Sequence, residues 1–197
     1  MGYSIEPITA DCYEGTTCLI NKFGITDEQQ LAHVEGQITF AKGSELERCP
    51  LNGKFDFSHY KAIHKYLFED IYEWAGEIRR VDISKKGTDF AKSHEIEQLA
   101  DACFTRLKKQ NYLKGQSLEE FVENIVDFYC VTNMLHPFRE GNGRTQRIFL
   151  AQLIRHAGYD IHFSSMDADE LMTATIYAAD GVDTYLKQLF HKYIVQI

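Results

Sequence analysis

Residues 136 to 147, HPFREGNGRTQR, bring together side chains that could bind a phosphorylated ligand and move a proton. Glycines at 141 and 143 let the backbone approach an anion closely, and consecutive N–H groups can converge on it. Arg144 and Arg147 lie about 60° apart around the helix expected to follow. Two guanidinium groups beside such a loop suit a diphosphate or triphosphate better than a single carboxylate.

Further residues of this stretch would complete a reaction centre. Glu140 offers a carboxylate through which Mg²⁺ could bridge the protein to phosphate oxygens. Pro137 disfavours helical backbone at His136, so we expect a helix to end there with its imidazole accessible to water and substrate. An imidazole with a pKa near neutrality could accept a proton from an attacking hydroxyl. Phe138 is expected to anchor the loop in the core.

The other polar residues nearby have simpler interpretations. We expect Arg139 to be a solvated loop charge, and Thr145 and Gln146 to lie on the helix surface. Six further histidines show no metal-ligand spacing, and we interpret them as surface or packing residues: His59, His64, His94, His156, His162 and His191.

The elements that must position this stretch are expected to be helical. Apolar residues repeat at helical spacing after four candidate N-terminal caps: Thr26, Ser58, Ser93 and Ser117. The second of these helices is predicted to run to Gly76, and the fourth opens with a Ser117–Glu120 capping box. Further helices are expected from about Arg144 to Gly158, and over residues 167 to 179 and 182 to 195.

Residues 77 to 91, EIRRVDISKKGTDFA, depart from this helical pattern. β-Branched residues surround a Lys-Lys-Gly-Thr turn, which predicts a two-stranded ribbon or flap. An isolated hairpin is only marginally stable, so the flap must lean on the helices. The sequence therefore predicts a mainly α fold: a single domain over residues 1 to 197 with a small β-hairpin flap.

The composition is that of a globular protein with an acidic balance, being 44% hydrophobic and 25% charged with a net charge of −8. Non-specific nucleic-acid binding requires a basic surface, so we expect no direct nucleic-acid partner. No apolar run approaches the roughly 20 residues that cross a bilayer, so we expect no membrane partner. The first residues lack a basic segment followed by an apolar one, which predicts a cytoplasmic location without a secretory signal. The five widely spaced cysteines favour reduced thiols.

The stretch from 136 to 147 matches the Fic family signature, H-P-F-x-[D/E]-G-N-G-R-x-x-R, at every specified position. Residues 63 to 91, IHKYLFEDIYEWAGEIRRVDISKKGTDFA, resemble the helix and flap that precede the active site in Fic proteins. Residues 12 to 27, CYEGTTCLINKFGITD, resemble the opening of short toxin-type Fic proteins. The resemblance thus covers nearly the whole chain.

This resemblance implies a protein adenylyltransferase, which transfers AMP from ATP to a Ser, Thr or Tyr hydroxyl of a target protein. His136 would be the catalytic base, and Glu140 would bind Mg²⁺. The ATP phosphates would be held at the loop and the helix start, by Gly141, Asn142, Gly143, Arg144 and Arg147. Family flaps pair with the target backbone and line the nucleotide pocket, which assigns Lys86 and Gly87 to ATP binding.

Fic enzymes are typically restrained by a helix bearing [S/T]-x-x-x-E-[G/N], whose glutamate pairs with the second motif arginine, here Arg147. The nearest match is LAHVEG at residues 31 to 36, with Leu31 where Ser or Thr is required. We interpret Glu35 as part of an ordinary first helix. We therefore expect a separate small antitoxin to supply the inhibitory glutamate, and this chain to be the toxin. Similar short toxins modify type II topoisomerases such as DNA gyrase, which makes such an enzyme a possible target.

Two alternatives remain open. The first is a Doc-like kinase or another phosphate transferase, because the related Doc toxins hold ATP in reverse and phosphorylate their target. The other is a non-enzymatic binding module that keeps the motif as a nucleotide-sensitive scaffold.

Overall fold

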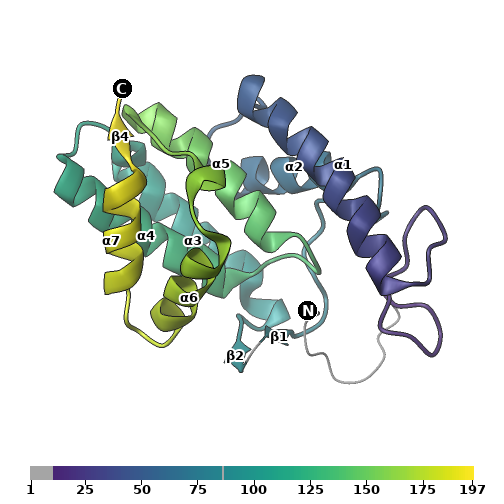
Figure 1. The fold of residues 1–197 in the computed structure, drawn as a ribbon. Coiled ribbons are helices and arrows are strands. Elements are labelled where there is room, and N and C mark those ends of the chain that lie inside the picture. Colours follow the sequence, from purple (N-terminus) through teal and green to yellow (C-terminus); the bar gives the residue numbers. More distant parts are fainter. Residues whose placement is uncertain (1–10, 86) are drawn as a thin grey trace.

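Helices dominate the computed structural model, which describes residues 11–85 and 87–197. They are α1 (Glu28–Arg48), α2 (Phe57–Phe68), α3 (Ile96–Lys109), α4 (Leu118–Leu135), α5 (Asn142–Ala157), α6 (Ala168–Ala179) and α7 (Thr184–Tyr193). Helix α5 runs through the middle of the molecule and contacts α1, α2 and α4 (Figure 1). Helix α4 in turn contacts α3, α6 and α7. The predicted mainly α architecture is confirmed.

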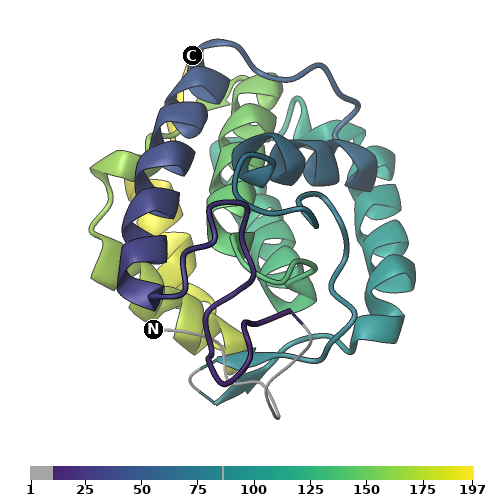
Figure 2. The ribbon, with the colours of Figure 1, turned by 90° about the vertical axis from the view of Figure 1, so that its right-hand side faces the viewer.

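The strands of the described residues form two small antiparallel pairs. The flap is β1 (Ser84–Lys85) paired with β2 (Thr88–Asp89), with Ser84 opposite Asp89, and it lies at one edge of the helical body (Figures 1 and 2). The second pair, β3 (Tyr159–Asp160) with β4 (Val195–Gln196), was not expected from the sequence. This pairing explains why α7 ends at 193 rather than continuing to 195.

Helix starts were predicted with mixed success. The Ser117–Glu120 capping box is confirmed: Ser117 Oγ accepts from Glu120 N at 3.3 Å, and the Glu120 carboxylate accepts from Ser117 N at 3.4 Å. The caps predicted at Thr26 and Ser58 are wrong. Each start uses a neighbouring aspartate instead, and these caps are Asp27 and Asp56. A charged carboxylate accepts a helical N–H more strongly than a neutral hydroxyl does, which favours the aspartates.

Helix α2 ends at Phe68, well before the predicted stop at Gly76. The apolar residues that continue the helical pattern, such as Ile71, are buried in turns instead. The carbonyl of Ile71 accepts a hydrogen bond from Lys22 N at 2.8 Å, so a tertiary contact takes the place of the next helical turn. Gly76 has a φ of +86° and lies against Lys65, where a side chain at 76 would collide.

The core contains a run of stacked rings that reaches the 136–147 stretch. His64 on α2 stacks between Phe138, at a centroid distance of 3.8 Å, and Phe68, at 4.7 Å. Its Nδ1 accepts from Gly76 N at 2.8 Å, and its Nε2 donates to the Glu140 carbonyl at 3.0 Å. His64 is thus a packing residue, as the sequence suggested, and it fixes one end of the loop.

Two features of the chain bear on its surroundings. Within the described residues, no helix is both long and apolar enough to cross a membrane. The cysteines, all of which lie in the described part, form no disulfide.

We predict that His64 makes stability fall as pH is lowered. Burial lowers its pKa to about 3, whereas the unfolded chain titrates near about 6.5. The unfolded state therefore binds more protons between these values, so stability is complete above about pH 6.5 and declines toward pH 3. The expected contribution between pH 7 and pH 5 is about 2 kcal/mol. Denaturant unfolding of His64→Gln should show a smaller pH 7 to pH 5 decline than wild type. The exposed His94→Gln should match wild type, and equal declines in all three proteins would refute the prediction.

Candidate functional site

The 136–147 stretch joins the end of α4 to the start of α5. His136 closes α4 with a φ of 39° and a ψ of 60°, a left-handed conformation that ends the helix before Pro137 as predicted. The Asn142 side chain spans the loop, because its Oδ1 accepts from Phe138 N and its Nδ2 donates to Phe138 O, both at 2.8 Å. Phe138 is completely buried. The amide of Asn142 therefore holds the loop in shape.

Gly141 is the tightest point of the loop. Its φ is +78°, and a Cβ at this position would stand 2.2 Å from the Phe68 ring. Only glycine combines that conformation with that contact. Helix α5 begins at the next residue, and its start carries no side-chain cap among the described residues. The free N–H groups of this first turn, with the positive end of the helix dipole, form a site suited to an anion.

Arg144 is enclosed by partners. Its Nη2 lies 2.5 Å from Glu35 Oε1 and 3.4 Å from Glu140 Oε1, and its Nη1 donates to Thr39 Oγ1 at 3.1 Å. Glu35 belongs to α1 as expected, but its side chain is buried and serves Arg144, which the sequence interpretation did not foresee.

Arg147 is in the opposite situation. It is half-buried, and no ion pair or hydrogen bond to the rest of the described chain satisfies it. Burial lowers the pKa of its guanidinium, and the charge of Arg144 lowers it further against an opposing effect of Tyr129. A Cβ at Gly143 would stand 3.3 Å from Arg147 Nη1, so the guanidinium lies against the loop backbone. A cation held in this way favours an incoming anion.

His136 is more enclosed than the sequence suggested. It is only 8% exposed, and burial lowers its pKa to about 3, with the hydrogen bond to Asn133 opposing and the charges of Lys85 and Arg79 assisting. The expectations of an accessible imidazole and of a near-neutral pKa are both wrong. Its Nδ1 lies 2.9 Å from the Asn133 carbonyl, so Nδ1 carries the proton and Nε2 the lone pair.

Phe90 and Arg79 of the flap segment hold this histidine. The Phe90 ring stacks on the imidazole at a centroid distance of 3.7 Å and an interplanar angle of 14°. Arg79 is buried and donates to the backbone carbonyls of His136, Val81 and Ala91. The flap base and the end of α4 are thus joined through one guanidinium. Sequence reasoning missed both residues, since neither lies in a motif with a recognisable spacing.

The predicted flap site residues are only partly visible. Lys86 lies outside the described residues. Gly87 has a φ of +83° in open surroundings at the turn of the hairpin. Lys85 faces His136 closely enough to influence its pKa.

Three residues of the motif differ from expectation. Arg139 is buried, 3.5 Å from Asp11 Oδ2, and is not a solvated charge. Thr145 is fully buried, with its hydroxyl on the Gly141 carbonyl. Gln146 is also buried and donates to Tyr129 O and Thr132 Oγ1, both at 2.8 Å. These polar groups lock α5 to the loop and to α4, because this face of α5 is turned inward.

Glu140 is the one motif carboxylate available to a metal. Its Oε1 accepts a hydrogen bond from Gly141 N at 2.8 Å, and the Glu140 side chain is 27% exposed. No cluster of three or more His, Cys, Asp or Glu side chains arranged to hold a metal occurs in the part of the chain that the structure describes. Mg²⁺ requires no such cluster when phosphates supply the other ligands, so a single carboxylate fits this ion.

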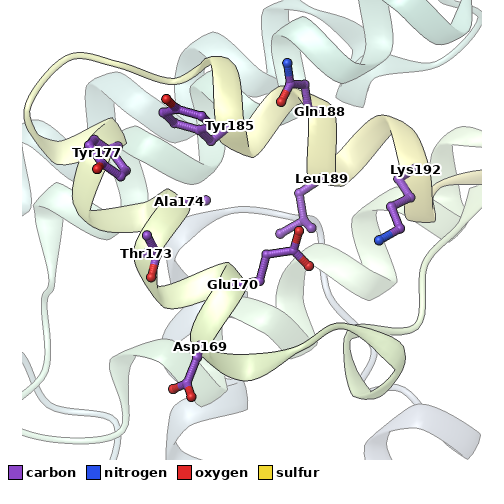
Figure 3. Close-up of a pocket in the computed structure, with 9 residues that line it drawn as sticks. All are labelled: Asp169, Glu170, Thr173, Ala174, Tyr177, Tyr185, Gln188, Leu189 and Lys192. Atoms are coloured by element: carbon purple, nitrogen blue, oxygen red, sulfur yellow. The ribbon is translucent and has the colours of Figure 1, made fainter.

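A separate groove lies between α6 and α7. Figure 3 shows Tyr177 and Tyr185 toward one end of it and Lys192 toward the other. It shares no residue with the 136–147 stretch and has no arrangement suited to the chemistry described above.

Comparison with known proteins identifies the family of this chain. Residues 54–154 match the Fic/DOC family model. The chain is 38% identical over 181 residues to protein adenylyltransferase VbhT of Bartonella schoenbuchensis, covering 92% of this chain and 38% of that protein's length. It is 36% identical over 182 residues to the probable protein adenylyltransferase Fic of Salmonella typhimurium, covering 92% of this chain and 90% of that protein's length. The chain belongs to the Fic/DOC family.

Solved structures share the fold. The BepC protein of Bartonella tribocorum, crystallised with bound AMPPNP, superimposes with a TM-score of 0.89 at 30% identity, covering 95% of this chain and 97% of that one. The N-terminal Fic domain of a Bartonella quintana effector with bound ADP gives a TM-score of 0.88 at 30% identity, covering 94% of each chain. Similarity to these nucleotide-bound domains and to named adenylyltransferases along most of the chain supports an enzymatic role in adenylyl transfer.

We predict that Gly141→Ala destabilises the protein more than Gly158→Ala. Both positions have positive φ, which costs a non-glycine residue about 1–2 kcal/mol. Only at 141 does the new methyl group meet a ring, and such overpacking adds about 1–3 kcal/mol. Denaturant unfolding of the two variants makes the comparison. Equal losses in the free energy of unfolding would show that the Phe68 ring does not restrict position 141 to glycine.

We also predict that Phe90→Ala raises the pKa of His136. Removing the stacked ring admits water to the imidazole, which relieves the desolvation that lowers its pKa to about 3. Lys85 and Arg79 remain, so the pKa should rise by about one unit or more without fully recovering. NMR titration of the imidazole measures the change, and the exposed Phe40→Ala serves as control. An unchanged pKa in Phe90→Ala would contradict the assigned role of the ring.

Proposed function

We propose that this chain transfers AMP from ATP to a Ser, Thr or Tyr hydroxyl of a target protein and releases pyrophosphate. The observation that carries the proposal is the Arg147 guanidinium. It is half-buried and without a partner in the described chain, next to the loop backbone and the uncapped start of α5. Phosphate oxygens satisfy all of these groups together.

In this proposal His136 accepts the proton of the target hydroxyl. The Asn133 carbonyl holds the Nδ1–H, which directs the basic Nε2 toward the substrate. Burial lowers the pKa of His136, so the imidazole is unprotonated and has a lone pair to accept a proton at neutral pH. The hydroxyl oxygen then forms a bond to the α-phosphorus, the bond from that phosphorus to the bridging oxygen breaks, and pyrophosphate leaves. The proton resides on His136 after the step.

The phosphates would be held by the loop and the start of α5. Asn142 with the backbone of Gly141 and Gly143 would hold the α-phosphate, and Arg144 and Arg147 the β- and γ-phosphates. Glu140 would hold Mg²⁺, which neutralises phosphate charge in such transfers. Gly87 and Lys86 would line the nucleotide at the flap.

We further propose partners from the same geometry. A target segment would add to the short β1–β2 hairpin through backbone hydrogen bonds. A separate antitoxin would supply a glutamate for Arg147, because this chain offers it none among the described residues. We also propose that residues 1 to 197 act as one domain and that the chain is a toxin in the cytoplasm. A type II topoisomerase is its proposed target. These proposals rest on the resemblance to short toxin-type Fic proteins.

ATP labelled at either the α- or the γ-phosphate, incubated with the chain and a bacterial lysate, tests the reaction. We expect protein-bound label from the α position only, and an added mass of AMP on a hydroxyl-bearing residue. His136→Ala should lower transfer by about 10²-fold or more, as expected for loss of a general base. Transfer from the γ position would establish a kinase instead. Nucleotide binding without transfer would establish a binding module.

A further inference from the structure

Glu35 and Thr39 lie one turn apart on α1 and both contact the head group of Arg144. We propose that these two are positioning residues that hold the Arg144 guanidinium for the phosphate chain of the nucleotide. Helix α1 would then be part of the nucleotide site without touching the nucleotide. This inference rests on the proposed function, in which Arg144 meets the β- and γ-phosphates.

Three contacts fix the plane of the guanidinium. Nη2 lies between Glu35 Oε1, at 2.5 Å, and Glu140 Oε1, at 3.4 Å. Nη1 donates to Thr39 Oγ1 at 3.1 Å. The Phe68 ring supports the flat face, 4.8 Å from Cζ. If Glu140 held Mg²⁺, Glu35 would be the carboxylate that remains on the arginine.

Glu35 is itself held rigidly. It is 7% exposed, and its second oxygen, Oε2, accepts a hydrogen bond from the Tyr72 hydroxyl at 2.5 Å. Burial raises the pKa of Tyr72, and the charge of Glu35 raises it further, so the phenol stays protonated and keeps donating. The Thr39 hydroxyl donates to the Glu35 carbonyl at 2.7 Å, which ties the two residues together. Each oxygen of the Glu35 carboxylate thus has a fixed partner.

This arrangement distinguishes a positioning carboxylate from one that competes with phosphate. A competitor must leave when the nucleotide arrives, but departure of Glu35 would strand its own charge and the Tyr72 hydroxyl in a buried place, which is costly. Leu31 and Leu46, buried on the same helix, keep α1 in position. The guanidinium has five N–H donors, of which the contacts above use three, and the Arg144 side chain remains 29% exposed. A phosphate oxygen can therefore bind without displacing Glu35.

Calorimetric binding of AMPPNP and of AMP, each with Mg²⁺, tests the inference. AMP lacks the phosphates that Arg144 would meet. We expect Glu35→Ala to weaken AMPPNP binding about tenfold while leaving AMP binding within about twofold of wild type. Glu35→Gln keeps an acceptor oxygen, so its AMPPNP affinity should lie between those of Glu35→Ala and wild type. Glu47→Gln removes an exposed carboxylate from the same helix and should leave both affinities unchanged.

Thr39→Val provides an independent variant if Glu35→Ala does not fold, as judged by thermal unfolding. It removes one contact to Arg144 at nearly constant volume and should weaken AMPPNP binding by a few fold, whereas Thr39→Ser should restore it. Unchanged AMPPNP binding in Glu35→Gln and Thr39→Val would overturn the proposal. So would tighter binding or faster AMP transfer in Glu35→Gln, because that result identifies a competing carboxylate. The proposed function fails separately if the wild-type chain binds AMPPNP but transfers no AMP.

Discussion

The Phe68 ring is the contact on which the rest of the site depends. It occupies the space above Gly141, supports the Arg144 guanidinium at 4.8 Å and stacks on His64 at 4.7 Å. His64 in turn holds the carbonyl of Glu140. This one apolar side chain at the end of α2 therefore determines how closely the loop approaches α2 and where the Arg144 guanidinium lies. Phe68 thus belongs to the hydrophobic core and also lines the polar site.

Charge is distributed unevenly across the two motif arginines. Arg144 is balanced by Glu35 and Glu140, whereas Arg147 has no partner within the described residues and lies against the loop backbone. Arg144 is thereby held in one orientation with part of its side chain still exposed, and Arg147 is left to attract an anion. The uncapped turn of α5 adds to that attraction. An anion at this corner would therefore meet one arginine that is fixed in place and one that has no competing partner within the described residues.

The sequence predicted what depends on local pattern and failed where tertiary contacts decide. The end of α4 at His136 follows from Pro137, and the Ser117–Glu120 cap follows from residues three apart. The early stop of α2 does not, because Lys22 and Gly76, both outside the helix, determine it.

The candidate site shows the same division. The motif predicts the site residues, and the structure ends α4 at His136 and begins α5 directly after the glycine loop, as expected. His136 is buried, which lowers its pKa to about 3, and Phe90, the ring that stacks on it, lies 46 positions earlier in the chain. The pairing of Arg144 depends on Glu35 and Tyr72, which come from separate segments. No periodicity connects such distant positions, so a single sequence could not reveal them.

The Arg79 contacts join the base of the flap to the end of α4 and leave the hairpin turn outside them. The guanidinium joins the carbonyls at 81 and 91 to that of His136, and the Ala91 N–H bonds to Met134 O at 2.9 Å. These contacts fix the backbone of His136 at the base of the flap, and the Phe90 ring then stacks on the imidazole. Under the proposed function, the strands that would pair with a target are therefore attached to the end of α4 by contacts that do not use the side chains of those strands.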